Sequence, residues 1–232
     1  MTYDLYIGDR TFSSWSLRGW LMFEKFGLSV RTHLVGLYSG TMAQDLAHLA
    51  PARLVPVVRT PEGTVIGESL AIAETLAERH PEKGLWPKDA AQRARARWLS
   101  AEMAAGFSAL RTACPMQLCH VNSGFAASDA VRSDLKRVED LWQSAWDMCG
   151  SDKGWLFGDY SLADVFFAPV AARIVGYDLN VSKTARAYCM RVLSDPAVVA
   201  WRDAGLELTY DPFPYDVHAP IAPWPIPSVN VS

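Results

Sequence analysis

The chain has 232 residues, half of them hydrophobic, which is enough for one large domain or two small ones with a substantial core. Its formal net charge of -3 and its pI of about 5.9 argue against nucleic acid or an anionic membrane as the main partner. No apolar run approaches the ~20 residues of a membrane span, and the N-terminal residues lack the basic region and apolar core of a signal peptide.

The first part of the chain predicts a small mixed sheet covered by helices. Residues 3–7 alternate in polarity as a strand does, and residues 13–26 have helical spacing that Gly27 ends. The expected order is strand, helix, strand, helix, strand, strand, helix, over residues 3–7, 13–26, 30–35, 41–49, 57–60, 64–66 and 69–78. A right-handed βαβ unit followed by a ββα unit builds such a sheet, so residues 1–80 are expected to form one domain.

The second part of the chain, residues 89–210, predicts an all-helical domain. Helical patterns cover residues 90–110, 128–149, 161–175, 183–193 and 196–206, and no strand is expected after Glu68. The tail over residues 211–232 is rich in proline and therefore cannot be helical. We expect it to be extended, either packed on the surface or loose.

The start of the helix at Ser69 has the polarity of a binding site. A serine at a helix start offers a hydroxyl and free backbone N–H groups, and the positive helix end favours an anion such as a carboxylate. Glu68 beside it offers the opposite charge, suited to an ammonium group. Together they match the zwitterionic end of an amino acid or γ-glutamyl peptide, although the same residues could form an ordinary helix cap after a hairpin.

A proline at the start of the preceding strand points in the same direction. X-Pro bonds are the only common cis peptides, and a cis bond at Val55-Pro56 would leave the Val55 backbone free to pair with a bound peptide. The alternative is an ordinary trans proline that opens an edge strand.

The cysteines and histidines suggest neither disulfides nor a metal site. The four cysteines lack Cys-x-x-Cys spacing, which predicts reduced thiols in a cytoplasmic protein. None of the five histidines pairs with a cysteine at ligand spacing, so we expect no bound metal. The cysteines are Cys114, Cys119, Cys149 and Cys189.

Four short motifs in this order resemble the cytosolic glutathione transferase family. They are Ser13-Ser14-Trp15-Ser16-Leu17-Arg18, Val55-Pro56, Glu68-Ser69-Leu70-Ala71-Ile72 and Ser161-Leu162-Ala163-Asp164. The last is a capping box that starts the central helix of the second domain in this family. The resemblance implies a thioredoxin-like α/β domain followed by an all-α domain, glutathione as co-substrate, a small electrophile as second substrate, and a homodimer.

Within the family, the double serine followed by an arginine is most similar to the zeta class, whose pattern is Ser-Ser-Cys-x-x-Arg. This chain departs from the pattern because Trp15 stands at the cysteine position and Thr41 stands where zeta enzymes carry a glutamine near the glycine end of glutathione. Arg53 is a candidate substitute for that glutamine. The resemblance therefore implies glutathione contacts from Trp15, Arg53, Val55, Pro56, Glu68 and Ser69.

The two serines at the first helix are the candidate catalytic residues. The thiolate of glutathione is the reactive form, and a hydroxyl that donates to sulfur at the positive end of a helix favours it. The zeta pattern favours Ser13 as the thiol partner, with Ser14 one position away as the second candidate. Either serine could also serve only as a helix cap. Arg18 is expected to pack and pair inside the first domain.

The electrophile is expected between the two domains. Arg111 and Arg173 are the polar residues there that could bind an anionic substrate, although both could instead be interface or salt-bridge residues. Phe12 and Phe107, together with Trp15, could line an apolar wall.

These features favour a glutathione transferase that activates the thiol for attack on a small electrophile, by conjugation or by zeta-like isomerisation or dehalogenation. The alternative is a glutathione-binding regulatory protein of the same fold that has no catalytic activity, because a fold does not fix a function. A glutathione-dependent reductase or lyase is disfavoured because residues 13–16 contain no cysteine.

Overall fold

The first half of the chain forms a four-stranded mixed sheet. The computed structural model describes residues 2–152, 154–207, 214–215 and 217–228. The strands are β1 (Tyr3–Ile7), β2 (Val30–Leu34), β3 (Val57–Arg59) and β4 (Val65–Ile66). Their order is β2-β1-β3-β4, with β2 parallel to β1 and the other two pairs antiparallel. The expected mixed sheet and the expected order of its strands along the chain are therefore confirmed.

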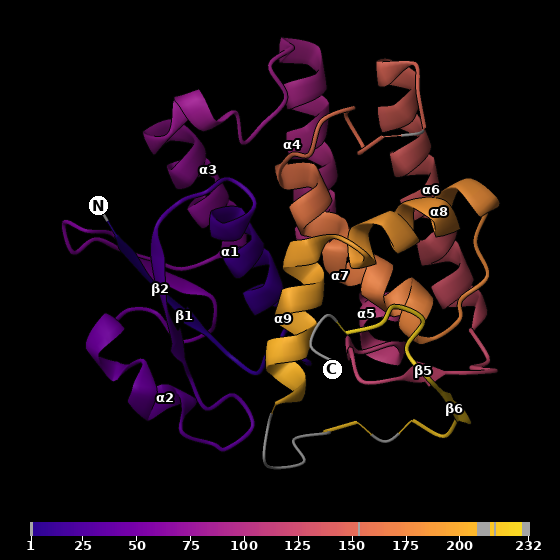
Figure 1. Cartoon of the computed structure of the whole chain (residues 1–232), viewed down its shortest axis with the longest axis horizontal. Coiled ribbons are helices and arrows are strands. Elements are labelled where there is room, and N and C mark those ends of the chain that lie inside the picture. Colours follow the sequence, from indigo (N-terminus) through magenta and orange to yellow (C-terminus); the bar gives the residue numbers. More distant parts are fainter. Residues whose placement is uncertain (1, 153, 208–213, 216, 229–232) are drawn as a thin grey trace.

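Three helices accompany this sheet (Figure 1). They are α1 (Ser14–Glu24), α2 (Met42–Asp45) and α3 (Ser69–Arg79), and short 3-10 turns follow at Ala47–Leu49 and Pro81–Lys83. The helix expected over residues 41–49 is divided into α2 and a 3-10 turn. This segment buries only Leu46 and Leu49, and so few apolar contacts do not hold a longer helix.

The second half consists mainly of helices, as expected. They are α4 (Ala90–Ala105), α5 (Ser108–Ala113), α6 (Asp129–Cys149), α7 (Leu162–Gly176), α8 (Lys183–Leu193) and α9 (Pro196–Leu206). Every residue of α7 is buried, which makes it the centre of this half. The predicted capping box of Ser161 and Asp164 is present at its start, and the buried Asp164 carboxylate accepts hydrogen bonds from the Ser161 N–H (2.9 Å) and the Tyr188 hydroxyl (2.9 Å).

The helix expected over residues 90–110 is broken after Ala105. Gly106 is extended and Phe107 adopts a left-handed conformation with φ 58°, after which α5 begins. A Cβ at Gly106 would lie 2.8 Å from the Glu102 carbonyl oxygen, so a side chain does not fit there. The break turns the chain and sets Arg111 on a separate short helix.

The expectation of no strand after Glu68 is wrong for two short segments, one in the second half and one in the tail. Strand β5 (Val121–Asn122) pairs antiparallel with β6 (Ile221–Ala222) of the proline-rich tail, as Figure 1 shows. Two-residue strands carry too little periodicity to be predicted from sequence. The tail is thus extended and packed over residues 217–228, while residues 208–213, 216 and 229–232 of the predicted helical domain and tail lie outside the described residues.

The two halves pack closely against each other. Helix α1 lies against α7 and α9, and the Trp20 and Trp201 rings are 5.2 Å apart. The Trp201 indole N–H also donates to the Arg10 carbonyl oxygen at 2.7 Å. These contacts fix the start of α1 relative to the helical half. The candidate site borders the start of α1, where Trp15 lies.

Candidate active site

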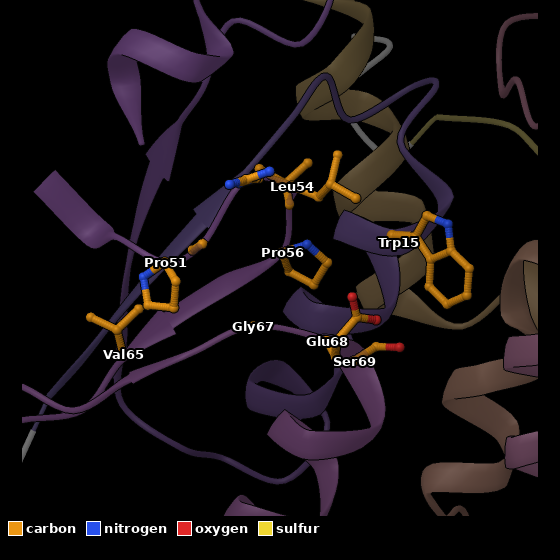
Figure 2. A pocket seen from close by; sticks show the side chains of 11 residues that line it. Trp15, Pro51, Leu54, Pro56, Val65, Gly67, Glu68 and Ser69 are labelled. Carbon is orange, nitrogen blue, oxygen red and sulfur yellow. The ribbon is translucent and has the colours of Figure 1, made fainter. Parts of the chain in front are cut away.

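A cavity of about 510 Å³ opens beside the start of α3 (Figure 2). All six residues predicted to contact glutathione line it, although they come from three separate stretches of the chain. Its lining residues are Trp15, Pro51, Ala52, Arg53, Leu54, Val55, Pro56, Val65, Gly67, Glu68 and Ser69. The fold therefore brings together the residues that the motifs had singled out separately.

The polar end of the cavity is the N-terminus of α3. Glu68 is the N-cap of the helix and Ser69 is its first residue. Figure 2 shows the Glu68 carboxylate and the Ser69 hydroxyl at this helix start. The unpaired N–H groups of the first turn and the helix dipole favour a carboxylate here, and the Glu68 side chain favours an ammonium group. Glu68 has a φ of 62°, a conformation that costs a non-glycine residue energy and that clusters at ligand sites.

A second wall of the cavity is the segment before β3. The Val55-Pro56 peptide bond is cis, which is the form considered in the sequence analysis. Among the described residues, no backbone hydrogen bond engages Val55, so its main chain is available to a bound peptide. Arg53 also lines the cavity and is exposed, and it supplies positive charge there.

Ser13 caps α1, and its hydroxyl is already oriented. The Ser13 oxygen accepts from the Ser16 N–H at 3.3 Å, and its O–H donates to the Ser16 hydroxyl at 2.7 Å. The side chain is 6% exposed and does not line the cavity, although Trp15 two residues later does. Ser13 thus sits at the positive end of α1 with a hydrogen that a ligand would have to draw away from Ser16.

Ser14 is placed differently from Ser13. It is the first residue of α1, it is half-buried, and within the described part of the chain its side chain makes no hydrogen bond. It also lies outside the lining of the cavity. The two candidate catalytic hydroxyls therefore differ in their surroundings. The Ser13 hydroxyl is hydrogen-bonded to Ser16 of α1, whereas the Ser14 hydroxyl has no such bond among the described residues.

Two arginines lie over the Trp15 indole, and a third arginine lies near them. The guanidinium of Arg18 lies over this ring at 4.3 Å from its centroid, and that of Arg111 lies at 5.0 Å. Arg173 is close enough for its charge to lower the pKa of Arg18, after the larger effect of burial. Burial, followed by the charge of Arg111, lowers the pKa of Arg173 to about 10. Both arginines expected between the domains are thus brought to one place.

Arg18 packs inside the first domain as expected, over Trp15, but the expectation that it also pairs there is wrong. Its Nε donates to the Phe166 carbonyl oxygen of α7 at 2.9 Å, and its buried Nη2 has no partner among the described residues. Arg173 donates to the carbonyl oxygens of Cys114 (2.9 Å) and Pro169 (3.1 Å). Within the described residues, the hydrogen bonds of these two buried arginines go to neutral carbonyl oxygens and not to carboxylates, so the cluster carries net positive charge.

The two phenylalanines expected at the apolar wall are both buried, in different surroundings. Phe107 belongs to the main core, one turn before Arg111. Phe12 contacts Tyr38, at 6.1 Å between ring centroids, and Tyr215, at 5.8 Å. Sequence reasoning missed both tyrosines, because Tyr215 lies in the tail and nothing in its neighbourhood points to this contact.

Other kinds of site are not seen in the described residues. There, no group of three or more histidine, cysteine, aspartate and glutamate side chains could hold a metal ion. No described helix is long and apolar enough to cross a membrane.

Comparison with known proteins places the chain in a family. The model of the glutathione S-transferase N-terminal domain matches residues 12–79. The chain is 32% identical to a probable maleylacetoacetate isomerase of Caenorhabditis elegans over 182 residues. This match covers 77% of this chain and 81% of that protein. The chain belongs to the glutathione S-transferase family.

A second relative supports the zeta-like character of this chain, and solved structures support its fold. It is 31% identical over 169 residues to a maleylacetoacetate isomerase of Pseudomonas aeruginosa, with 71% of this chain and 78% of that protein covered. A solved glutathione transferase homolog from Burkholderia, with bound glutathione, has a TM-score of 0.65 at 24% identity and covers 89% of this chain and 99% of its own. Omega 2S of Trametes versicolor gives a TM-score of 0.67 at 21% identity, covering 89% of this chain and 96% of its own. The expected fold is confirmed.

Proposed function

We propose that this transferase binds glutathione in the cavity beside α3 and activates its thiol for attack on a small electrophile. The observation that carries the proposal is the meeting of Glu68, Ser69 and Val55 around one cavity that Trp15 also lines. The γ-glutamyl carboxylate would lie at the α3 N-terminus and its ammonium group beside Glu68. The Val55 backbone would pair with the peptide, and Arg53 would face the glycine carboxylate.

The thiol would lie at the start of α1. The Ser13 oxygen is held by the Ser16 N–H, so its hydrogen can turn from the Ser16 hydroxyl to the sulfur without losing the helix cap. A hydroxyl donor and a positive helix end both favour the thiolate over the thiol. Ser13 is therefore the proposed donor, and Ser14 is the position to compare with it.

The electrophile would be small and anionic. The cluster of Arg18, Arg111 and Arg173 beside Trp15 has positive charge that neutral carbonyl acceptors do not balance. A bound carboxylate would balance it and would lie near the thiol, since Trp15 borders both places. Residues 1–80 would thus hold glutathione, and residues 89–210 would supply most of the electrophile site.

A regulatory protein that only binds glutathione is the second candidate. Two observations favour it: the Ser13 hydroxyl is already satisfied by Ser16, and Trp15 occupies the cysteine position of the zeta pattern. Such a protein would hold glutathione without lowering the pKa of its thiol.

The assay that separates the two candidates uses the purified full chain. Glutathione binding is measured by calorimetry, and turnover is measured with chloroacetate, a maleyl compound and 1-chloro-2,4-dinitrobenzene. We expect binding together with faster turnover of the anionic substrates than of the neutral aryl halide at equal concentrations. Binding without turnover of any of the three would support the regulatory protein, and absence of binding would refute both.

We also propose a cytoplasmic homodimer. The large apolar side chains exposed among the described residues include Leu54, at 65% in the loop before β3, and Trp98, at 52% on α4, and a second copy would cover these two. No disulfide joins any of the four cysteines in the described part of the chain, which agrees with a reducing compartment. Light scattering at micromolar concentration tests the dimer, and Leu54→Glu should shift the mass toward the monomer while the exposed control Ile221→Glu should not.

A further inference from the structure

The proline-rich tail is built into the helical half. Besides the pairing of β6 with β5, the Ser123 N–H donates to the Pro220 carbonyl oxygen at 2.7 Å. Trp224 is 9% exposed, and the Arg202 guanidinium lies 5.6 Å from its ring centroid. Arg202 also donates to the Ser228 hydroxyl at 3.1 Å. The tail therefore has a defined path over residues 217–228.

Just before this anchored stretch, the tail touches the first half of the chain. The Tyr215 hydroxyl is 2.8 Å from that of Tyr38, which follows β2. Its ring packs edge-on against Phe12, at 5.8 Å between centroids and an angle of 73°. Phe12, Tyr38 and Tyr215 thus form one aromatic group, with Tyr215 held at both its ring and its hydroxyl.

This aromatic group is linked both to the proposed thiol position and to the arginine cluster. Phe12 immediately precedes Ser13, the proposed thiol donor. On the other side, Tyr215 and Arg173 are near enough that the arginine's charge lowers the pKa of Tyr215, although burial raises it more. An electrophile that reaches from the sulfur to Arg173 would therefore meet the Tyr215 ring.

We propose that Tyr215 is a specificity-determining residue, which together with Phe12 and Tyr38 forms a fixed wall that restricts the electrophile site to small substrates. This inference rests on the proposed function for the position of the electrophile. Tyr215 is held in this wall by its contacts to Phe12 and Tyr38, and the tail is anchored to the helical half over residues 217–228. Its removal should open the site instead of weakening the hold on glutathione, whose proposed cavity does not include Tyr215.

The test compares Tyr215→Ala with the wild type and with Ile221→Ala, a change at a 70% exposed position of the same tail. The ratio of kcat/KM for 1-chloro-2,4-dinitrobenzene to that for chloroacetate is measured at saturating glutathione. We expect Tyr215→Ala to raise this ratio at least fivefold with the KM for glutathione unchanged within twofold, and Ile221→Ala to leave both unchanged. Tyr215→Phe, which keeps the ring and loses the hydroxyl contact to Tyr38, should give a smaller rise.

A measurement without turnover separates this inference from the proposed function. Binding of 8-anilinonaphthalene-1-sulfonate, a bulky aromatic anion, is followed by its fluorescence, and Tyr215→Ala should bind it at least fivefold more tightly than the wild type. This result supports the wall even if the wild type turns over no electrophile. Unchanged dye affinity in a Tyr215→Ala protein whose melting temperature matches the wild type would overturn the inference, whatever the activity.

Discussion

The guanidinium of Arg111 lies over the indole ring of Trp15, 5.0 Å from its centroid, and joins the start of α1 to α5. The two residues are far apart in the chain, and the break at Gly106 and Phe107 gives Arg111 the short helix that carries it there. Cation–π contacts are worth about 0.5–2 kcal/mol, depending on burial. Trp15, which stands at the cysteine position of the zeta pattern, thus positions a cation beside the proposed thiol.

Loss of the Trp15 ring should weaken the use of anionic electrophiles. We expect Trp15→Ala to raise the KM for chloroacetate severalfold at saturating glutathione, with a smaller effect on a neutral aryl halide, and Trp15→Phe to keep most of the wild-type KM. Arg111→Gln should give the same pattern. If the two changes act through one contact, their combined effect should be smaller than the sum of the single effects, and simple additivity would contradict the contact.

Changes at the start of α3 should act on glutathione binding. We expect the double variant Glu68→Gln and Ser69→Ala to bind glutathione more than tenfold more weakly, a loss of about 1.4 kcal/mol. The control is Glu78→Gln, an exposed carboxylate on the same helix that lies outside the cavity. Wild-type affinity of the double variant by calorimetry would show that glutathione does not bind here.

The serines should differ in their effects on thiol ionisation. Thiolate absorbance of bound glutathione, followed against pH, should titrate at higher pH in Ser13→Ala than in the wild type, because the donor to sulfur is gone. Removal of one positioned donor typically costs ~10²–10³ in rate, and we expect the low end because water can replace a hydroxyl. Ser13→Ala should also lower stability by about 1 kcal/mol through the lost cap.

Ser14→Ala provides the matched comparison. It removes a hydroxyl that caps nothing, so we expect little change in melting temperature and a smaller shift of the thiol titration. A larger shift in Ser14→Ala than in Ser13→Ala would transfer the donor role to Ser14. An unmoved titration in both variants would mean that neither hydroxyl activates the thiol.

Asp164 should be structural, with a pH dependence of defined sign. Burial raises the pKa of its carboxyl from 3.8 to about 6, against the hydrogen bonds from the Leu156 and Ser161 N–H groups and the Tyr188 hydroxyl. Between about pH 4 and 6 the folded protein keeps a proton that the unfolded chain has lost. This carboxyl's contribution to the free energy of unfolding therefore falls as the pH rises through that window.

The measurement compares wild type with Asp164→Asn, which does not titrate. The difference in the free energy of unfolding, wild type minus variant, should decrease from pH 4 to pH 6 and then stay level. Asp164→Ala should lower the melting temperature by removing the capping box, a loss of ~1 kcal/mol or more. A loss of turnover with an unmoved melting curve would instead place Asp164 in the active site.

The sequence by itself determined the type of fold, the element order of the first half and six of the residues that line the cavity beside α3. These follow from local patterns: alternation in β1, the serine that caps α1, the turn before β4, and the helix start at Glu68 and Ser69. A pattern confined to a few neighbouring residues acts through backbone geometry and polarity that those residues fix themselves. The same local rules overestimated the helix over residues 90–110, because the conformations of Gly106 and Phe107 are not visible in helical spacing.

Only the tertiary structure decided which distant residues meet. Arg18 was expected to pair within the first domain, but it donates to Phe166 of the second half. Arg173 lies near it because α1 packs on α7, and Arg111 comes close from the separate helix α5. Tyr215 reached Phe12 through a tail whose strand pairing is two residues long. Such contacts depend on how helices pack and on where a chain returns, and since no residue's neighbours in sequence encode them, they appear only when the whole core has formed.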